Sequence, residues 1–303
     1  MSRTKDPGLG SKYQKEVKRL VNDDGSYNIK RHGALKGFRD FYKYLIDISW
    51  PKFILLTFAY YIILNVLFAC LYLIAGVDGI TGFNEEHNDF LDAFFFSVQT
   101  LTSVGYGQLS PISTDINVIA TIESFAGVMS IAFVTGLTYG RFSKPRAKLG
   151  FSKNILITPY KDVNGLMFKL VNKRDSILLN AHVKTILIMD KGGNVDQFNK
   201  EYFILNLELN HIHFFPLTWT IVHKIDSDSP IFGMSIDELI VRNAEVLVLV
   251  EAFDETHSQN ITQKHAYGGE DWLDGVKFKK NFKVNNEGVI ELNIKELDDV
   301  IGV

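Results

Sequence analysis

Three apolar stretches stand out in the first half of the chain. Phe53–Ala75 holds 23 residues without a charge, and Ile116–Tyr139 is interrupted only by Glu123 and a few small polar residues. Both exceed the roughly 20 residues that a helix needs to cross a bilayer, so both predict transmembrane helices. Asn88–Leu101 is aromatic and apolar but has only 14 residues. This length predicts a re-entrant helix that enters the membrane and turns back, with a buried helix of a soluble domain as the alternative.

The regions on either side of these stretches have other periodicities. Before the first, Leu35–Trp50 repeats apolar residues at helical spacing among basic ones, which predicts an amphipathic helix at the membrane surface that Pro51 ends. From Ser152 onward, short alternating runs are separated by turn residues and predict an antiparallel, immunoglobulin-like sandwich with one short helix, Ser235–Arg242. The expected strands are Ile155–Ile157, Leu166–Val171, Val183–Met189, Tyr202–Leu209, Thr218–His223, Val246–Glu251 and Val276–Phe282.

Charge distribution orients the predicted spans. No Lys or Arg lies between Phe53 and Gly140, whereas basic residues are frequent on both outer flanks. The positive-inside rule therefore predicts a multi-pass protein with both termini in the cytoplasm. The polar start predicts no cleavable signal peptide and a mobile N-terminus over residues 1–34. The single cysteine, Cys70, excludes an intrachain disulfide and a cysteine-based metal site.

A glycine-spaced segment follows the short apolar stretch. Thr100–Pro111 reads T-L-T-S-V-G-Y-G-Q-L-S-P, and glycine permits backbone dihedrals that turn successive carbonyl oxygens toward one axis. Four such segments around that axis would replace the water shell of a potassium ion. A G-Y-G triplet alone is most often a turn, so the flanking helices decide its interpretation. We call Thr102, Ser103, Val104, Gly105, Tyr106 and Gly107 the filter segment, and we predict that it binds potassium.

This segment resembles the potassium-channel signature T-V/I-G-Y-G, with Ser103 at the position of Thr. Most of the chain resembles bacterial inward-rectifier potassium channels. The resemblance rests on the order of the predicted helices, on the basic R-F-S-K-P-R-A-K after the last one, and on the later stretches N-A-H-V-K, P-L-T-W-T-I-V-H and D-S-P-I-F-G. The departures are Ser103 and a long acidic turn at Asp78–Asn88. The resemblance implies a homotetramer organised as an N-terminus (1–34), a slide helix (35–51), a pore domain (52–142) and a cytoplasmic β-sandwich (143–303).

Residues of the last apolar helix are candidates for the pore wall and for support of the filter. Ile131, Thr135 and Tyr139 are four residues apart and so share one helix face. The resemblance implies an aromatic constriction at Tyr139 and weak rectification, because Ile131 stands where strong rectifiers carry Asp. Packing against a neighbouring helix is the alternative for Thr135. Glu123 is predicted to support the filter from behind, with Gln99 as its partner, and a place in the cavity wall is the alternative.

Basic residues near the membrane surface are candidates for binding lipid. A cluster there can attract anionic lipids, and the resemblance implies phosphoinositides or other anionic lipids; the alternative is that these charges only set topology. The candidates are Arg39, Lys43, Arg141, Lys144, Arg146 and Lys148.

The sequence gives little support to a metal site, an enzyme active site, a nucleotide-binding domain or a nucleic-acid interface. His211 and His213 share a strand face, but no third ligand lies at metal-site spacing, so whether they bind anything stays open. The chain has no nucleophile–base signature, no G-x-G-x-x-G after a strand and no basic stripe for nucleic acid. We therefore predict no enzyme, no cofactor beyond the permeant ion and no nucleic-acid partner.

The sequence thus favours a tetrameric potassium channel of the bacterial inner membrane. A nonselective cation channel in which Ser103 relaxes selectivity is the first alternative. A membrane-tethered sensor whose β-domain binds a small ligand is the second, and a purely structural anchor is the third.

Overall fold

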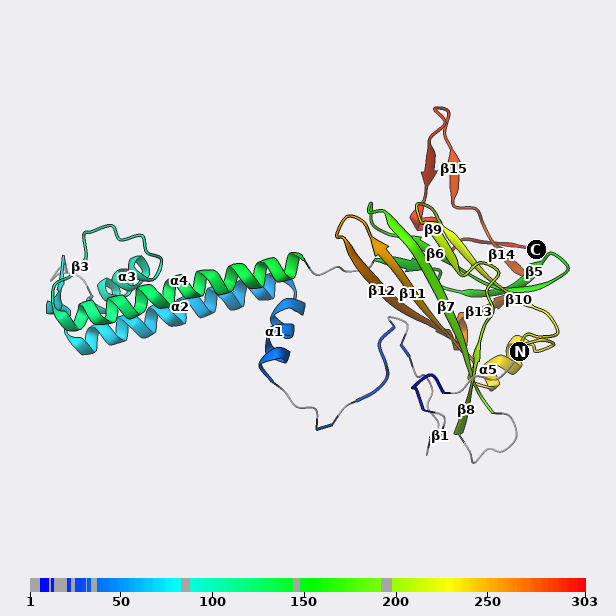
Figure 1. Cartoon of the computed structure of the whole chain (residues 1–303), viewed down its shortest axis with the longest axis horizontal. Coiled ribbons are helices and arrows are strands. Elements are labelled where there is room, and N and C mark those ends of the chain that lie inside the picture. The colour runs from blue at the N-terminus through cyan, green and yellow to red at the C-terminus, as the bar shows by residue number, and fades with distance from the viewer. Residues whose placement is uncertain are drawn as a thin grey trace. The chain divides into compact units, whose positions relative to one another are not determined.

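The computed structural model describes residues 6–10, 12–13, 21–22, 25–30, 32–33, 37–82, 88–143, 148–191 and 198–303. The chain forms two compact units (Figure 1). One is helical and covers Gly33–Lys144. The other combines Met1–His32 with Pro145–Val303 and is rich in strands.

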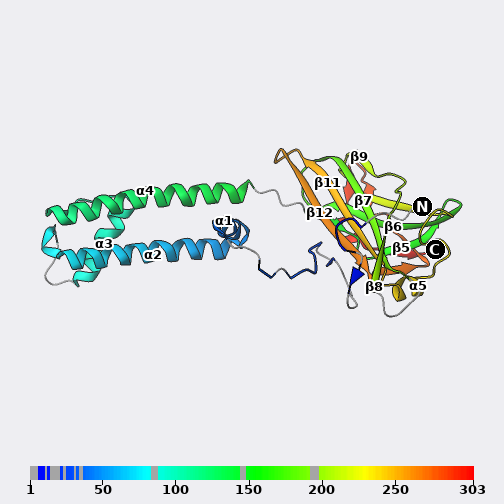
Figure 2. The same cartoon turned by 60° about the horizontal axis from the view of Figure 1, so that its bottom comes forward.

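Four helices build the helical unit. They are α1 (Phe38–Asp47), α2 (Trp50–Ala75), α3 (Asp89–Leu101) and α4 (Thr114–Phe142), with a short 3-10 turn η1 (Val77–Gly79) and the strand pair β2 (Ile80–Thr81) and β3 (Ser110–Pro111) between them. Helices α2 and α4 run side by side, and the shorter α3 packs against both of them (Figure 2). Both long helices are apolar and long enough to cross a membrane.

The helix boundaries follow from local chemistry. The side chain of Asn88 accepts a hydrogen bond from Phe90 N at 2.9 Å, and that of Ser113 accepts one from Ile116 N at 3.3 Å, so each caps the helix that follows it. The predicted helix over Leu35–Trp50 proves shorter, because α1 ends at Asp47. Trp50 instead begins α2, and Pro51 lies in the first turn, where its missing N–H costs nothing.

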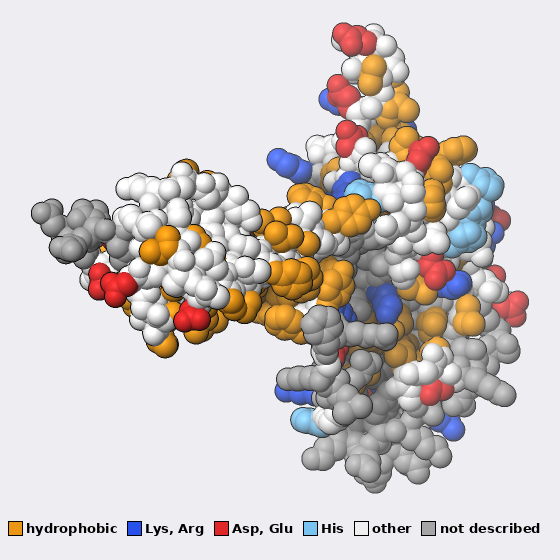
Figure 3. Space-filling view, turned by 60° about the vertical axis from the view of Figure 1, so that its left-hand side comes forward, with side chains coloured by type: hydrophobic (Ala, Val, Ile, Leu, Met, Phe, Trp, Pro, Cys, Tyr) orange, Lys and Arg blue, Asp and Glu red, His pale blue; other side chains and the backbone are white. Residues whose placement is uncertain are grey.

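The surface of the helical unit is largely apolar. Ile54, Leu55, Phe58 and Ile63 of α2 are each 60–68% exposed. Hydrophobic side chains gather along much of this unit (Figure 3). Exposed apolar surface on this scale is typical of helices that face lipid or other protein chains.

The second unit is a sandwich of two sheets. The first has the order β1 (Lys12–Tyr13), β8 (Phe198–Ile204), β7 (Leu178–Asp190), β11 (Glu245–Asp254) and β12 (Gln259–Gly268), with β9 (His211–Phe214) also paired to β7. The second has the order β10 (Trp219–Ile225), β6 (Val163–Asn172), β5 (Ile155–Tyr160) and β13 (Trp272–Asp274), with β4 (Leu149–Phe151) on β6. All pairs are antiparallel except β13 with β5. Phe168, Val183, Trp219 and Val248 belong to the core formed by the two sheets.

The predicted fold class is confirmed, although some strands differ from the prediction. Each of the first six predicted strands overlaps an observed strand, and the short helix α5 (Ile236–Val241) lies within its predicted range. Val276–Phe282 is not one strand: β14 (Val276–Phe278) pairs with β17 (Val300–Gly302), and β15 (Phe282–Val284) pairs with β16 (Ile290–Leu292). The expected strands did not include β1 to β4, β12, β13, β16 or β17, and β9 was indicated only by the strand face that His211 and His213 share. The glycine pair after Lys191, one of the turn signals between the expected strands, lies outside the described residues.

Described parts of the N-terminus pack against the first sheet. Strand β1 pairs with β8, and Val21 is fully buried with Tyr202 and Leu247 in a small apolar cluster. A Cβ added to Gly25 would lie 2.4 Å from the carbonyl oxygen of Lys264. The described part of residues 1–34, which we expected to be mobile, therefore contributes strand β1 and the buried side chain of Val21.

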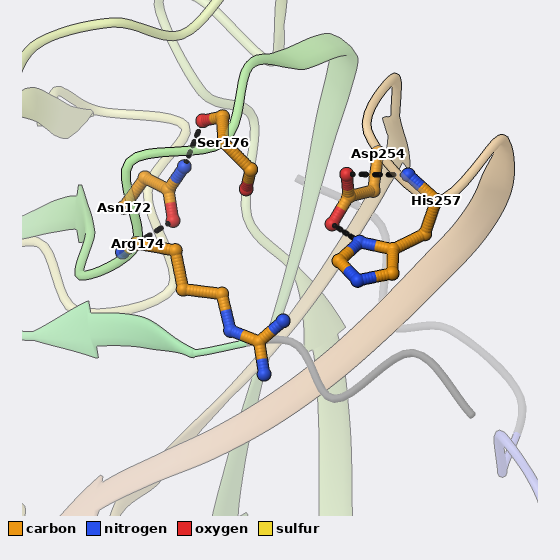
Figure 4. A network of polar contacts seen from close by, with 5 residues as sticks. All are labelled: Asn172, Arg174, Ser176, Asp254 and His257. Carbon is orange, nitrogen blue, oxygen red and sulfur yellow. Dashed lines mark hydrogen bonds and ion pairs between the residues drawn. The ribbon is translucent and has the colours of Figure 1, made fainter. Parts of the chain in front are cut away.

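Two loops of the sandwich are braced by their own polar side chains (Figure 4). In the β6–β7 loop, Asn172 donates to the carbonyl oxygen of Ser176 at 2.6 Å and accepts from Arg174 N at 3.0 Å. In the β11–β12 loop, the Asp254 carboxylate pairs with the His257 ring at 3.1 Å. The loops are joined by Glu255 N, which donates to the carbonyl oxygen of Ile177 at 3.1 Å.

Candidate functional site

The amide groups of the filter segment are bound to the end of helix α3. The carbonyl oxygen of Gln99 accepts hydrogen bonds from Val104 N at 2.9 Å and Gly105 N at 3.3 Å. The side-chain oxygen of the same Gln99 accepts one from Tyr106 N at 3.1 Å, and its side-chain nitrogen donates to the carbonyl oxygen of Leu109 at 3.4 Å. One glutamine therefore holds three consecutive filter amides, so Gln99 contacts the filter segment directly.

Four successive carbonyl oxygens of the filter segment, those of Ser103 to Tyr106, accept no hydrogen bond from the described residues, whereas that of Gly107 accepts one from the Ser110 hydroxyl at 3.2 Å. Residues 103, 105 and 107 have positive φ values of 57°, 57° and 84°, and they alternate with residues in ordinary conformations. Oxygens without protein donors are the ligands that a partly dehydrated cation requires.

The conformation of Ser103 was not predicted. A non-glycine residue at positive φ is uncommon and costs free energy, so the hydrogen bonds around it must impose it. Ser103 N donates to the carbonyl oxygen of Thr100 at 3.1 Å, within the same set of bonds that holds the next two amides. The available signal was the two-residue spacing of Gly105 and Gly107, because the same spacing continued toward the N-terminus reaches Ser103.

Among the described residues of the protomer, no element covers one face of the filter segment. Val104 is 53% exposed and Tyr106 is 83% exposed, although both are large apolar side chains. Side chains of this kind are rarely left in solvent at this level, so the segment is suited to contact with further protein copies.

Glu123 lies near α3 but does not contact the filter segment. It is fully buried, and its carboxyl group bonds to the hydroxyls of Tyr72 on α2 and Ser97 on α3. The predicted partnership with Gln99 is therefore wrong, because Gln99 uses its amide on Tyr106 and Leu109. The bond between Glu123 and Ser97 ties Glu123 to α3, which we call the pore helix, two residues before Gln99.

The predicted pore-wall residues share an exposed face of α4. Ile131 is 57% exposed and Tyr139 is 74% exposed, and Thr135 between them is also exposed. Ile131 and Thr135 border an apolar groove of about 540 Å³ between α2 and α4, which Phe53 and Phe58 line from the other side. The stripe is thus available to line a pore, and its role there stays a prediction.

The structure gives Arg141 a partner other than lipid. Its guanidinium is 7% exposed and donates to the carbonyl oxygens of Leu45, Ile46 (3.0 Å) and Ile48 (2.7 Å) at the end of α1. It also lies 4.6 Å from the ring centre of Trp50. Arg141 therefore satisfies the unpaired carbonyls of α1, which leaves it poorly suited to bind a headgroup.

Two of the remaining lipid candidates can be placed. Lys43 and Lys148 are both exposed. Lys144, Arg146 and the side chain of Arg39 lie outside the described residues.

Three histidine rings cluster on β7 and β9: His182, His211 and His213. Nothing in the sequence spacing pointed to His182 as a neighbour of the other two. The ring of His211 stacks on that of His182 at 4.1 Å between centres and meets that of His213 edge-on at 4.6 Å. Desolvation, followed by the neighbouring histidines, lowers the pKa of His211. Among the described residues, no group of three or more His, Cys, Asp or Glu side chains could hold a metal ion.

Comparison with known proteins agrees with this geometry. Residues 53–144 match the ion channel family, and residues 149–303 match the family of inward rectifier potassium channel C-terminal domains. The chain belongs to the inward rectifier potassium channel family. It is 34% identical over 284 residues to the inward rectifier potassium channel Kirbac3.1 of Paramagnetospirillum magnetotacticum, across 93% of this chain and 95% of that protein.

The family assignment confirms the resemblance, the fold class and the expectation that the chain is not an enzyme. A solved structure of the alkylpurine DNA glycosylase AlkC of Pseudomonas fluorescens, bound to DNA containing an abasic site analog, also matches. The match covers 61% of this chain and 48% of the glycosylase chain. The sequence identity is 8% and the TM-score is 0.18, so this structural likeness carries no argument. The helical unit of this inward rectifier is that of a membrane protein.

Proposed function

We propose that four copies of this chain form a channel through which potassium crosses the membrane passively. The observation that carries the proposal is the asymmetry of Ser103 to Tyr106: their amides donate to Gln99 and Thr100, while their carbonyl oxygens accept no hydrogen bond from the described residues. One protomer supplies one such row of oxygens, and a cation that has lost its water shell needs oxygens on several sides. A closed ring of identical copies supplies them.

The pore wall and its regulation belong to the same proposal. The exposed stripe Ile131–Thr135–Tyr139 would line the cavity, and Tyr139 would form the constriction at the cytoplasmic end. Because Ile131 is apolar, the cavity has no acidic ring at that level to hold a blocking cation, so rectification is weak. Lys43 and Lys148 would contact anionic lipid, and both termini would lie in the cytoplasm of a bacterial inner-membrane protein. Conduction would need no cofactor.

Potassium flux from liposomes tests the proposal. The purified full chain should release potassium from loaded vesicles, barium should block the release, and Gly105→Asp should abolish it because it puts a charged side chain at a position with φ of 57°. A variant that assembles normally and keeps full flux would overturn the assignment of the filter segment.

Selectivity is measured separately. The reversal potential in mixed potassium and sodium should follow the potassium gradient. Equal permeabilities would instead support the nonselective channel, in which Ser103 has relaxed the filter. Varying the fraction of anionic lipid in the same vesicles gives the sign of the lipid effect, and an unchanged flux would rule out that regulation.

A further inference from the structure

Four buried polar side chains meet where three helices of the helical unit come together. Asn65 and Tyr72 come from α2, Ser97 comes from α3 and Glu123 comes from α4, and all four are fully buried. The Tyr72 hydroxyl donates to one oxygen of Glu123. The Ser97 hydroxyl lies within hydrogen-bond distance of the other oxygen of Glu123 and 3.0 Å from the amide oxygen of Asn65. Buried polar groups must satisfy one another, so the protons here can be counted.

The orientation of the Asn65 amide is fixed by its other partner. Its side-chain nitrogen lies 2.8 Å from the carbonyl oxygen of Tyr61, which can only accept. The amide nitrogen must therefore face Tyr61, and the amide oxygen must face Ser97. Because an amide oxygen cannot donate, the hydroxyl of Ser97 has to give its single proton to Asn65.

The contact between Ser97 and Glu123 then needs a proton from the carboxyl group. Ser97 has already used its own proton, and Tyr72 uses its proton on the other oxygen of Glu123. We propose that Glu123 is a neutral carboxylic acid in the folded channel and that, by donating to Ser97, it positions the pore helix. Every group is then paired: Tyr72 donates to Glu123, Glu123 to Ser97, Ser97 to Asn65, and Asn65 to Tyr61.

The ionised form leaves this network incomplete. With a carboxylate at Glu123, the one proton of Ser97 can serve either Glu123 or Asn65, so one buried acceptor loses its donor. A buried carboxylate also needs a nearby cation, because an uncompensated buried charge is costly. The chain has no Lys or Arg between Phe53 and Gly140 to supply one. Proton count and charge therefore favour the same neutral state.

The neutral network acts on the filter segment through the pore helix. Ser97 lies two residues before Gln99, which holds Val104, Gly105 and Tyr106 by their amides. A bond from α4 to Ser97, continued to α2 through Asn65, fixes this end of α3 from both sides. Glu123 is thus a positioning residue, and it needs no contact with the permeant ion.

Infrared spectroscopy of the full-length protein in lipid vesicles at neutral pH tests the protonation state. The wild-type protein should show the carbonyl stretch of a protonated carboxyl group, and Glu123→Gln should lack it. Tyr72→Phe should move this band to higher frequency, because the carbonyl loses its hydrogen-bond donor. A structural contact alone would produce neither signal.

Potassium flux is the second measurement. Its interpretation rests on the proposed function, whereas that of the infrared band does not. Glutamine can donate to Ser97 with its amide nitrogen and accept from Tyr72 with its oxygen, so Glu123→Gln should retain wild-type flux. Glu123→Leu, of similar size, makes neither bond and should lose flux or assembly.

Two results would overturn the inference. One is the absence of a protonated-carboxyl band in the wild-type protein, which can be checked with glutamate labelled with ¹³C even if Glu123→Gln fails to assemble. The other is a properly assembled Glu123→Gln that loses its flux. A wild-type protein that shows the band but conducts no potassium would refute the channel and leave the neutral acid standing.

Discussion

Helix α4 approaches the pore helix closely at Gly127, and filling this space should disturb the filter segment. A Cβ added to Gly127 would lie 1.9 Å from the carbonyl oxygen of Leu101 and 2.8 Å from its carbonyl carbon. Leu101 is the last residue of α3. Because these atoms belong to the backbone, no side chain can rotate away, and α4 must retreat by about 1.5 Å to reach ordinary contact.

The size of the effect follows from two opposing terms. Overpacking a well-filled core costs typically about 1–3 kcal/mol. Replacing glycine with alanine inside a helix recovers at most about 1 kcal/mol of helix propensity. Gly127→Ala should therefore destabilise each protomer by about 1–2 kcal/mol, which lowers a melting midpoint by several degrees. Displacing Leu101 should also shift the next residues of the filter segment and reduce potassium selectivity.

Gly136→Ala is the matched control for this experiment. It lies on the same helix, and a Cβ added there would meet no described atom within 4 Å apart from its chain neighbours and the adjacent backbone of its own helix. Thermal melting in lipid and the reversal potential in mixed potassium and sodium should show a loss for Gly127→Ala that exceeds any loss for Gly136→Ala. Equal midpoints and equal selectivity in the two variants would refute the packing argument.

Three further changes have expected outcomes. Arg141→Lys should speed hydrogen exchange in α1, because one ammonium cannot reach three carbonyl oxygens in a fixed plane; unchanged exchange would contradict this. Burial lowers the pKa of His223, so the folded state resists its protonation. The free energy of unfolding should therefore be highest above about pH 6.5 and fall below it, by at most about 1.4 kcal/mol per pH unit for this one group. Melting at a series of pH values should show the decline, and His223→Asn should flatten it. Gln99→Ala leaves Tyr106 N without its acceptor and should raise sodium permeability in reversal-potential measurements, whereas intact selectivity would argue against the bracing role.

Much of the molecule could be predicted because its signals are local. The apolar stretches at Phe53–Ala75 and Ile116–Tyr139 are long enough to identify α2 and α4 without any tertiary information. The glycines at 105 and 107 indicated the backbone that the filter segment adopts. Alternating apolar residues likewise predicted most strands of the sandwich, since a half-buried strand repeats every two residues.

Residues whose contacts lie with distant partners could not be predicted from local patterns. Arg141 looked like a headgroup ligand because it follows a membrane span, yet its guanidinium bonds to the carbonyl of Ile46, 95 positions earlier. The alternation of His211 and His213 indicated a strand there, but β9 was not among the expected strands, because it has only four residues and none of them is buried. It is the pairing with β7 that defines this strand.

The sequence by itself determined the two spans, the short helix and the filter segment, because hydrophobic length and glycine spacing act on neighbouring residues. Only the tertiary structure decided which side chains Glu123 contacts. Its partner Tyr72 lies 51 positions away, and neither residue reveals the other in the sequence. Once burial removes water as a partner, each proton must go to a specific atom, and that constraint exists only in the folded protein.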